Sequence, residues 1–376
     1  MNRLATIAGV GTSNFGKQAA TVEELVWLAI EEALAASGVE HPQIEAIFVG
    51  TVFSYTGTAH RALHAAGFAH QPIVTVDNAC ASGTLAVHLA VESVVNGKYK
   101  TVLAVGMEKM SDMITGALPT DPRDSEAAGG MIMPAMYAMS AHRYMAEYGV
   151  TAEDLAYVSV KNHHNALGNP RAQYRGDFTI EQVLESRKIA DPLTILQCSP
   201  ISDGAAAAII THPSVGRSGP SVLSSTFQSG ATWPQNHCDV WNYELIERTA
   251  ACSFDEAGVA ISDIDVVELH DAFTIGEIVA VESMGFFARG SGAAATRDGA
   301  TLPGASVAVN TSGGLLSRGH PLGATGVAQL AEVVWQLTGK AEGRQLDKAD
   351  IGVVETMGGS VAGLSGNGCL VLTLGA

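Results

Sequence analysis

Basic residues are scarce in this sequence. Its 376 residues include 21 Lys and Arg but 38 Asp and Glu, which gives a formal net charge of −17. Proteins that bind nucleic acid usually present a basic face to the phosphates. The charge balance therefore argues against nucleic acid as a partner.

Cysteine is also scarce, and long apolar runs are missing. The five cysteines are scattered and form no CxxC pair, so the pattern indicates neither a disulfide framework nor a structural zinc site. No run approaches the roughly 18 apolar residues that a transmembrane helix needs, and early glycines interrupt any signal-peptide core. We expect a protein without a membrane span in a reducing compartment, the cytoplasm.

Aromatic residues make up only 6% of the chain, whereas 41 residues are glycine. This composition favours close packing of backbone on backbone. Short β-branched runs at 44–50, 101–106 and 263–269 are typical of strands, and Ala/Leu-rich segments at 22–37 and 83–96 have helical spacing. The alternation predicts an α/β protein whose sheets are covered on both faces by helices.

An internal duplication is the clearest sign of organisation. Ala36–Val39 matches Glu256–Val259 at an offset of 220 positions, and each match continues into a predicted strand. Cys80–Gly83 and His320–Gly323 each precede a predicted helix, at an offset of 240. Chance similarity of two α/β units is the alternative, but two matches in the same order favour duplication. Across a pseudo-twofold axis, Cys80 and His320 would meet.

The duplication predicts an N-terminal half, residues 1–215, and a C-terminal half, residues 216–376. About 85 residues, roughly 109–197, have no counterpart in the second half. They begin with turns rich in proline and glycine and continue with helical patterns. We expect an inserted loop domain that covers the centre.

Cys80 is the first candidate for chemistry. It lies before the predicted helix at 83–96, where the helix dipole lowers the pKa of a thiol. Its own backbone N–H, unpaired at the helix start, can donate to an oxyanion. A lone cysteine can also be a small buried hydrophobe, but the small polar residues and the glycine beside Cys80 favour a nucleophile.

Two histidines are candidate partners for Cys80. His320 precedes Pro321 in a glycine-rich turn that opens a predicted helix, and a histidine within reach of a cysteine is the base that covalent catalysis requires. His270 follows the strand predicted at 263–269, and open α/β sheets place functional groups at strand ends. Oriented by a neighbouring acid, His270 could donate a hydrogen bond to a thioester carbonyl oxygen. A structural role is the alternative for both histidines.

Two further patterns receive weaker interpretations. The segment 357–368 is rich in glycine but lacks the GKS/T of a phosphate loop. It predicts a loop or tight hairpin that brings backbone N–H groups near the centre, before a last strand at 369–374. His163 and His164 are interpreted as a surface pair on a helix, since no acidic residue has metal-ligand spacing.

Taken together, these motifs resemble the thiolase superfamily over nearly the whole chain. Asp77–Gly83 resembles the nucleophile elbow of that family, Gly319–Gly326 its second signature, and Gly106–Ser111 the beginning of its loop domain. His270–Phe273, with the sequence His-Asp-Ala-Phe, is similar to the sterol-carrier-protein-type and archaeal thiolase-like branch. Biosynthetic and degradative thiolases carry an Asn-Glu motif there.

The resemblance implies a five-layered αβαβα thiolase fold, a homodimer or tetramer, no metal, and no tightly bound cofactor. Coenzyme A thioesters are then the substrates, although no residue can be assigned to coenzyme A. Cys80 would carry the acyl group, His320 would deprotonate it, and backbone N–H groups of Cys80 and Gly359 would hold the oxyanion. His270 would polarise the second thioester carbonyl. Relatives of the His-Asp type often associate with a small zinc-ribbon/OB-fold protein.

One position departs from the family pattern. Thiolases carry a second catalytic cysteine in a Cys-x-Gly motif. The corresponding segment here is Glu355–Gly359 or, with different gapping, Gly363–Ser365, and neither contains a cysteine. Some His-Asp-type relatives carry a cysteine where this chain has Ala272. Cys369 begins the last predicted strand and is expected to be buried. Acyl transfer onto Cys80 is expected, whereas a Claisen condensation lacks its usual base.

The expected function is a thiolase-type acyltransferase in lipid metabolism, similar to acetyl-CoA C-acyltransferase, that acts on acyl-CoA or β-ketoacyl-CoA. A decarboxylating condensing enzyme, whose reaction needs no abstraction of an α-proton, is one alternative, and a retro-aldolase on CoA thioesters is another. A non-catalytic subunit that binds acyl-CoA or lipid is the alternative from another class.

Overall fold

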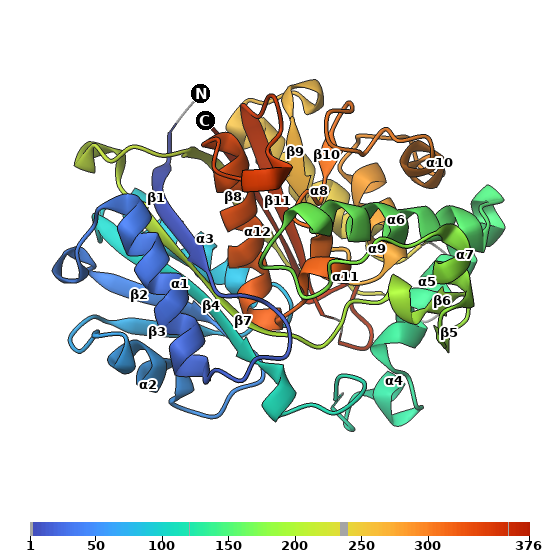
Figure 1. Cartoon of the computed structure of the whole chain (residues 1–376), viewed down its shortest axis with the longest axis horizontal. Helices are drawn as coiled ribbons and strands as arrows, with labels where there is room; N and C mark the ends of the chain where they lie inside the picture. The colour runs from blue at the N-terminus through green and yellow to red at the C-terminus, as the bar shows by residue number, and fades with distance from the viewer. Residues whose placement is uncertain (1–2, 120, 234–239, 360) are drawn as a thin grey trace.

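The computed structural model describes residues 3–119, 121–233, 240–359 and 361–376 (Figure 1). Ten strands form one mixed sheet in the order β3-β2-β4-β7-β1-β8-β12-β11-β9-β10. The strands of the first half are β1 (Ala5–Thr12), β2 (Ala46–Gly50), β3 (Ile73–Val76), β4 (Thr101–Lys109) and β7 (Asp203–Thr211). Those of the second are β8 (Ser221–Gln228), β9 (Val266–Glu268), β10 (Ala308–Val309), β11 (Ile351–Gly358) and β12 (Gly368–Gly375).

The strand order repeats the predicted duplication. The first half reads β3-β2-β4-β7-β1 and the second, from its far edge inward, reads β10-β9-β11-β12-β8. In both halves the first three strands are parallel and the next two pairings are antiparallel. The two halves of the sheet are continuous through β1 and β8, where Ala5 and Thr6 pair with Val222 and Ser221.

The two halves of the sheet and the helices beside them form five layers, with helices outside each half and between the two. The principal helices are α1 (Val22–Ser37), α2 (Thr58–Ala65), α3 (Ser82–Val95), α8 (Tyr243–Ala257), α9 (Thr274–Ser283) and α12 (Leu322–Leu337). Apolar side chains of α1 and α2 cover the outer face of the first half, and those of α8 and α9 cover the second. Helices α3 and α12 share a core with strands of both halves, and α12 lies at the centre of Figure 1. The five-layered thiolase fold is therefore confirmed.

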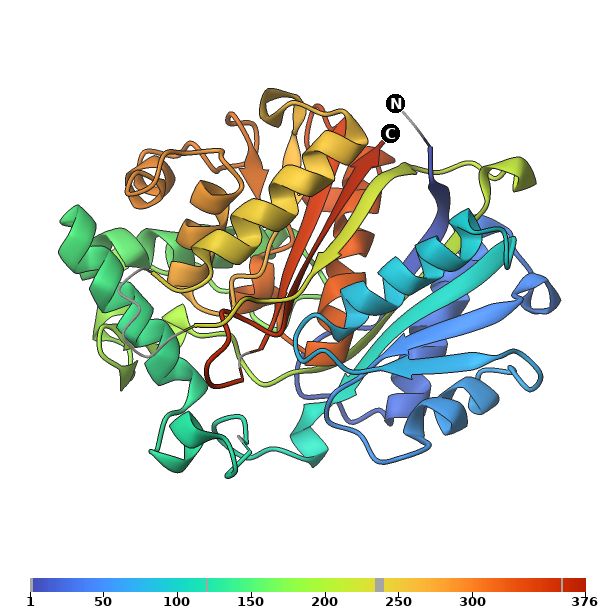
Figure 2. The same cartoon turned by 180° about the vertical axis from the view of Figure 1, so that it is seen from behind.

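Local sequence explains where these helices begin and end. Helix α1 has the bounds that the spacing predicts, because Thr21 caps its first turn reciprocally with Glu24 and Gly38 ends it at a φ of 63°. Figure 2 shows α3 in cyan and α8 in yellow from behind. The predicted helix at 83–96 is α3, displaced by one residue at each end.

Glycines let α3 and α12 meet by their first turns. A Cβ atom on Gly326 would lie 1.8 Å from Thr84 Oγ1, and one on Gly83 would lie 2.6 Å from the carbonyl oxygen of Gly323. No larger residue fits without moving a helix. The close approach brings the starts of the two equivalent helices together, as the duplication predicts.

The insertion connects β4 to β7. It contains α4 (Ser125–Ala128), α5 (Met133–Tyr148), α6 (Ala152–Asn165), α7 (Ile180–Glu185) and the hairpin of β5 (Lys188–Ala190) and β6 (Leu193–Thr194). It lies beside α9 and α10 (Gly292–Arg297) of the second half, in green in Figure 1. No helix in the described parts of the chain is long and apolar enough to cross a membrane.

Candidate active site

Cys80 lies in a strained turn between β3 and α3, two residues before the helix begins. The preceding residue, Ala79, has a φ of 47°, which residues with a Cβ rarely adopt. Ser82 closes the turn, because its hydroxyl accepts a hydrogen bond from the Asn78 N–H and donates one to the Ala79 carbonyl oxygen. Cys80 is 9% exposed and lines a cavity.

His320 occupies the equivalent place before α12, again two residues before the helix begins. The Thr325 hydroxyl donates to the Pro321 carbonyl oxygen at 3.0 Å, so it accepts from His320 Nδ1 at 2.8 Å. His320 therefore carries its proton on Nδ1 and has a lone pair on Nε2. Within the described residues, this Nε2 is buried and has no hydrogen-bond partner.

His270 follows β9 and completes the cluster. Its ring lies edge-on to that of His320, with the ring centroids 5.2 Å apart. The Cys80 sulfur and one ring nitrogen of each histidine lie within 4.8 Å of one another. The structure thus brings together the three side chains that the sequence selected from different regions of the chain.

The acid beside His270 does not have the place that we expected. The Asp271 carboxylate accepts hydrogen bonds from Asn162 Nδ2 and from the Leu315 N–H, both at 2.7 Å. It therefore holds the start of α11 (Gly314–Arg318). Glu355 instead accepts the backbone N–H of His270, at 2.9 Å. The prediction that the neighbouring acid orients the His270 ring is wrong, because Asp271 faces a helix start.

Burial is the largest influence on the ionisation of the cluster. It raises the pKa of the Cys80 thiol to about 12, against hydrogen bonds from the N–H groups of Gly359 and of Cys80 itself. Burial also lowers the pKa of His270 to about 3, and burial together with His270 and Arg318 lowers that of His320 well below its usual value. The predicted depression of the thiol pKa is wrong. The site holds a neutral thiol beside two neutral imidazoles.

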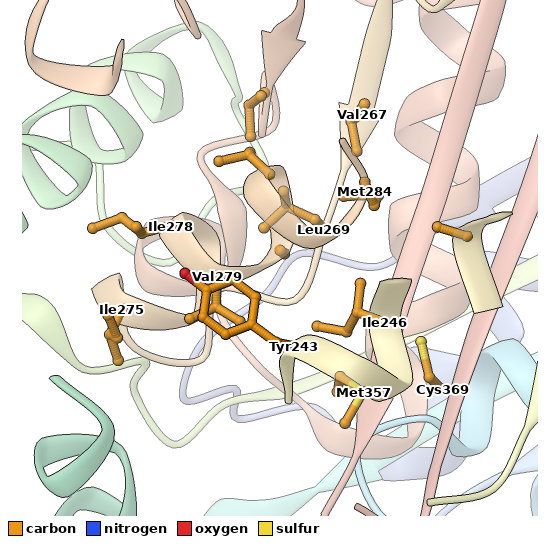
Figure 3. Packing of buried hydrophobic residues seen from close by; sticks show 14 of the residues in the cluster. Tyr243, Ile246, Val267, Leu269, Ile275, Ile278, Val279, Met284, Met357 and Cys369 are labelled. Atoms are coloured by element: carbon orange, nitrogen blue, oxygen red, sulfur yellow. The ribbon is translucent and has the colours of Figure 1, made fainter. Parts of the chain in front are cut away.

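Two backbone N–H groups face the Cys80 sulfur. They belong to Cys80 itself and to Gly359, which follows β11. A Cβ on Gly359 would lie 2.8 Å from the Cβ of Ala79, so only glycine allows this approach. Met357 is buried and lines the same cavity. Cys369 is fully buried in the core of the second half, near Met357 and Ile246 in Figure 3.

The cluster opens into a cavity of about 960 Å³. The insertion supplies one wall, which includes Ile132, Met133, Pro134, Tyr137, Phe178 and Leu196. The Tyr137 ring packs on Phe273 at 4.4 Å and meets Trp241 edge-on at 5.3 Å. Sequence reasoning missed these aromatic residues, because their spacing along the chain does not show which cavity they line.

Sequence reasoning misplaced one of the two adjacent histidines of α6. His163 is buried and lines the cavity, so its interpretation as a surface residue is wrong, whereas His164 is exposed.

Glu108 accepts the N–H groups of Phe53 and Gly323, at 2.8 and 3.0 Å. Burial raises its pKa to about 7. Glu108 thereby ties the start of α12 to the first half.

Comparison with known proteins identifies the family. The family model described as thiolase, N-terminal domain, matches residues 5–214, and the one described as thiolase C-terminal domain-like matches residues 232–371. The chain belongs to the thiolase family. The expected thiolase-type acyltransferase function is confirmed at this level.

Three curated relatives are similar to this chain, two of them over nearly their full length. An acetyl-CoA acetyltransferase of Methanothermobacter thermautotrophicus is 40% identical over 371 residues, covering 95% of this chain and 97% of the relative. The benzoylsuccinyl-CoA thiolase subunit BbsB of Thauera aromatica is 36% identical, with 92% of each chain covered. Human sterol carrier protein 2 is 32% identical, covering 95% of this chain and 70% of the relative.

Two solved structures are similar over almost the whole chain. The Ltp2-ChsH2(DUF35) aldolase has a TM-score of 0.82 at 25% identity, covering 99% of this chain and 97% of that one. Human mitochondrial 3-ketoacyl-CoA thiolase has a TM-score of 0.74 at 15% identity, with 100% of both chains covered. At that identity, the second likeness supports the fold alone.

Proposed function

We propose that this thiolase transfers acyl groups between CoA thioesters through a thioester on Cys80, with His320 as the base. Two observations carry the proposal: a ring nitrogen of His320 lies within 4.8 Å of the Cys80 sulfur, and among the described residues His320 Nε2 has no hydrogen-bond partner. Because Thr325 accepts from Nδ1, Nε2 holds the lone pair and can act as the base.

The acylation step follows from neutral reactants. As the Cys80 sulfur attacks the thioester carbon, its proton moves to His320 Nε2 and a carbon–sulfur bond forms. The N–H groups of Cys80 and Gly359 hold the resulting oxyanion, and one such donor is worth about 3 kcal/mol. The bond to the CoA sulfur then breaks, and the imidazolium of His320 returns the proton to that leaving group. The reverse sequence delivers the acyl group to a new thiol.

His270 has a different part in the proposal. Burial keeps its imidazole neutral, so it can donate a hydrogen bond without carrying charge. We assign it to the carbonyl oxygen of a second thioester. Substitution of His270 should therefore leave acylation of Cys80 largely intact and slow the reactions that need the second thioester.

The substrates are acyl-CoA and β-ketoacyl-CoA thioesters, and no tightly bound cofactor takes part. The wide apolar cavity supports acyl groups larger than acetyl. Relatives named for acetyl-CoA and for benzoylsuccinyl-CoA bracket this range. Acylation rates with acetyl-CoA, hexanoyl-CoA and benzoyl-CoA measure the preference directly.

The proposal extends to the assembly. We assign a homodimer or tetramer that works with a small zinc-ribbon/OB-fold protein. Two names support such a partner: BbsB is called a subunit, and the similar aldolase is named with a DUF35 protein. Light scattering on the purified chain measures the oligomeric state, and a monomer would contradict the assigned dimer or tetramer.

Retro-aldol cleavage of a β-hydroxyacyl-CoA is the second candidate, favoured by the absence of a cysteine at Met357 and by the likeness to an aldolase. That reaction breaks a carbon–carbon bond without an acyl-enzyme. A Cys80→Ser variant would keep aldol cleavage but lose acyl transfer, so this variant separates the two candidates.

Intact-mass measurement after incubation with acyl-CoA tests the proposal. The wild type should gain one acyl group, and Cys80→Ser should gain none. Cys198→Ser is the matched control, because Cys198 lines the same cavity and should leave the adduct unchanged. A wild type that gains no adduct from any acyl-CoA would overturn the proposal and favour a non-catalytic binding subunit.

A further inference from the structure

We propose that Cys80, His270 and His320 also bind a thiophilic divalent cation such as Zn²⁺, which blocks acyl transfer reversibly. The proposed reaction uses no metal, so the ion acts as an inhibitor rather than a cofactor. The inference stands on the geometry of three donor atoms and does not depend on the proposed function.

The donor atoms are close to the spacing of a metal site. They lie within 4.8 Å of one another. With Zn–N near 2.0–2.1 Å and Zn–S near 2.3 Å, ligand atoms around tetrahedral zinc are roughly 3.3–3.6 Å apart. A side-chain movement of about 1 Å closes the difference. One sulfur and two nitrogens leave the fourth position open to the cavity, where water or a CoA thiol can enter.

Each histidine of the cluster has a ring nitrogen without a partner among the described residues. In the described parts of the chain, the Nε2 atoms of His270 and His320 are buried without a hydrogen bond. Both residues are only 4% exposed. A buried polar atom without a partner is costly, and a metal ion would satisfy both nitrogens at once. Thr325 already provides the outer hydrogen bond that orients a ligating histidine.

Charge near the cluster also suits a cation. Binding of the ion releases one proton, because the Cys80 S–H bond breaks as the sulfur–metal bond forms and the proton passes to solvent. The Asp77 carboxylate lies near enough for its negative charge to act on Cys80. The same charge attracts a metal ion.

A matched control lies in the same cavity. Cys198 lines it, but its thiol donates to the Thr194 carbonyl oxygen at 3.2 Å. Among the described residues, the group formed by Cys80, His270 and His320 is the only one with the spacing of a metal site. Loss of Cys198 should therefore leave metal binding unchanged.

Titration of the full-length protein with Co²⁺ tests the inference, since bound cobalt reports a thiolate ligand by a near-ultraviolet charge-transfer band. We expect one equivalent to bind with release of one proton, and Zn²⁺ to displace it. Cys80→Ser should abolish the band, and His270→Gln should weaken binding, whereas Cys198→Ser should keep it. Thr325→Val should weaken binding by ~10–100-fold, the usual effect of an outer-shell partner.

A second arm avoids substitutions. Alkylation of Cys80 in the wild-type protein should prevent Co²⁺ binding without a change of fold, and EDTA should restore acyl transfer to Zn²⁺-treated enzyme. The inference is overturned if alkylated protein binds Co²⁺ as tightly as untreated protein, or if Cys198→Ser loses the band. A protein that binds Co²⁺ at Cys80 but never accepts an acyl group would refute the proposed function and leave the metal site standing.

Discussion

The two halves of the sheet have the same strand order, yet the equivalent helix starts carry different chemistry. Cys80 precedes α3 in the first half and His320 precedes α12 in the second, each by two residues. The turn at Cys80 is strained at Ala79, whereas the turn at His320 is held by Thr325. The duplicated scaffold thus supplies the meeting point, and in the proposed reaction single residues decide which side provides the nucleophile and which the base.

The connections that follow also differ. In the first half, β4 continues into the long insertion before β7, and this insertion builds the apolar wall of the cavity. In the second half, β11 passes to β12 through a short segment that contains Gly359. Equivalent connections therefore supply a wall of the cavity in one half and, in the proposed reaction, an oxyanion donor in the other.

Loss of His320, the proposed base, should have the largest effect of the substitutions considered. His320→Ala should lower the rate of Cys80 acylation by ~10²–10⁴, the contribution of a positioned general base. Added imidazole should restore part of the rate. Stopped-flow mixing with intact-mass detection measures the rate of acylation. A variant that acylates at the wild-type rate would show that His320 is not the base.

A cysteine at the position of Met357, in β11, should have the next largest effect. Exchange of acyl groups between thioesters should outrun self-condensation of acetyl-CoA by ~10² in the wild type, the scale of one lost acid–base group. Met357→Cys should narrow that ratio, since Met357 lines the cavity. If the wild type condenses acetyl-CoA as readily as it exchanges acyl groups, another base exists, and His270 would be the first to substitute.

A larger residue between the starts of α3 and α12 should lower the stability of the fold. Gly326→Ala places a methyl group in the space of Thr84 Oγ1. We expect a loss of about 1–3 kcal/mol in the free energy of unfolding, the usual cost of overpacking. Denaturant unfolding measures it. An unchanged transition midpoint would mean that the contact between α3 and α12 is looser than described.

Loss of the hydrogen bond that orients the base should have the smallest effect. Thr325→Val removes the acceptor of His320 Nδ1–H while keeping the shape of the side chain. We expect a loss of about 1 kcal/mol, roughly fivefold in acylation rate. A Thr325→Ser variant, which keeps the hydroxyl, should retain the wild-type rate. Equal loss in both variants would point to packing instead.

Sequence reasoning succeeded where the determinants are local. Thr21 and Gly38 fix the ends of α1, and the motifs around Cys80 and His320 each lie at the start of a helix. The family resemblance added Gly359, whose approach to Cys80 no local pattern reveals.

It failed where the outcome depends on distant segments. Glu355 holds the backbone of His270 from 85 positions away, and Tyr137 reaches the cavity from the insertion. The pKa of Cys80 is the clearest case. The helix start is visible in the sequence, but the burial that raises this pKa, against the backbone hydrogen bonds to the sulfur, comes from packing around the whole cluster.

The central claim is that the two helix starts form a neutral couple of thiol and imidazole. The far-ultraviolet absorbance of a thiolate tests it directly, by subtraction of the spectrum of Cys80→Ser from that of the wild type across a pH titration. Because burial raises the pKa of Cys80 to about 12, the difference should be absent at neutral pH and should emerge only in strongly alkaline solution. A full thiolate signal at neutral pH that disappears in His320→Ala would show an ion pair and contradict the account.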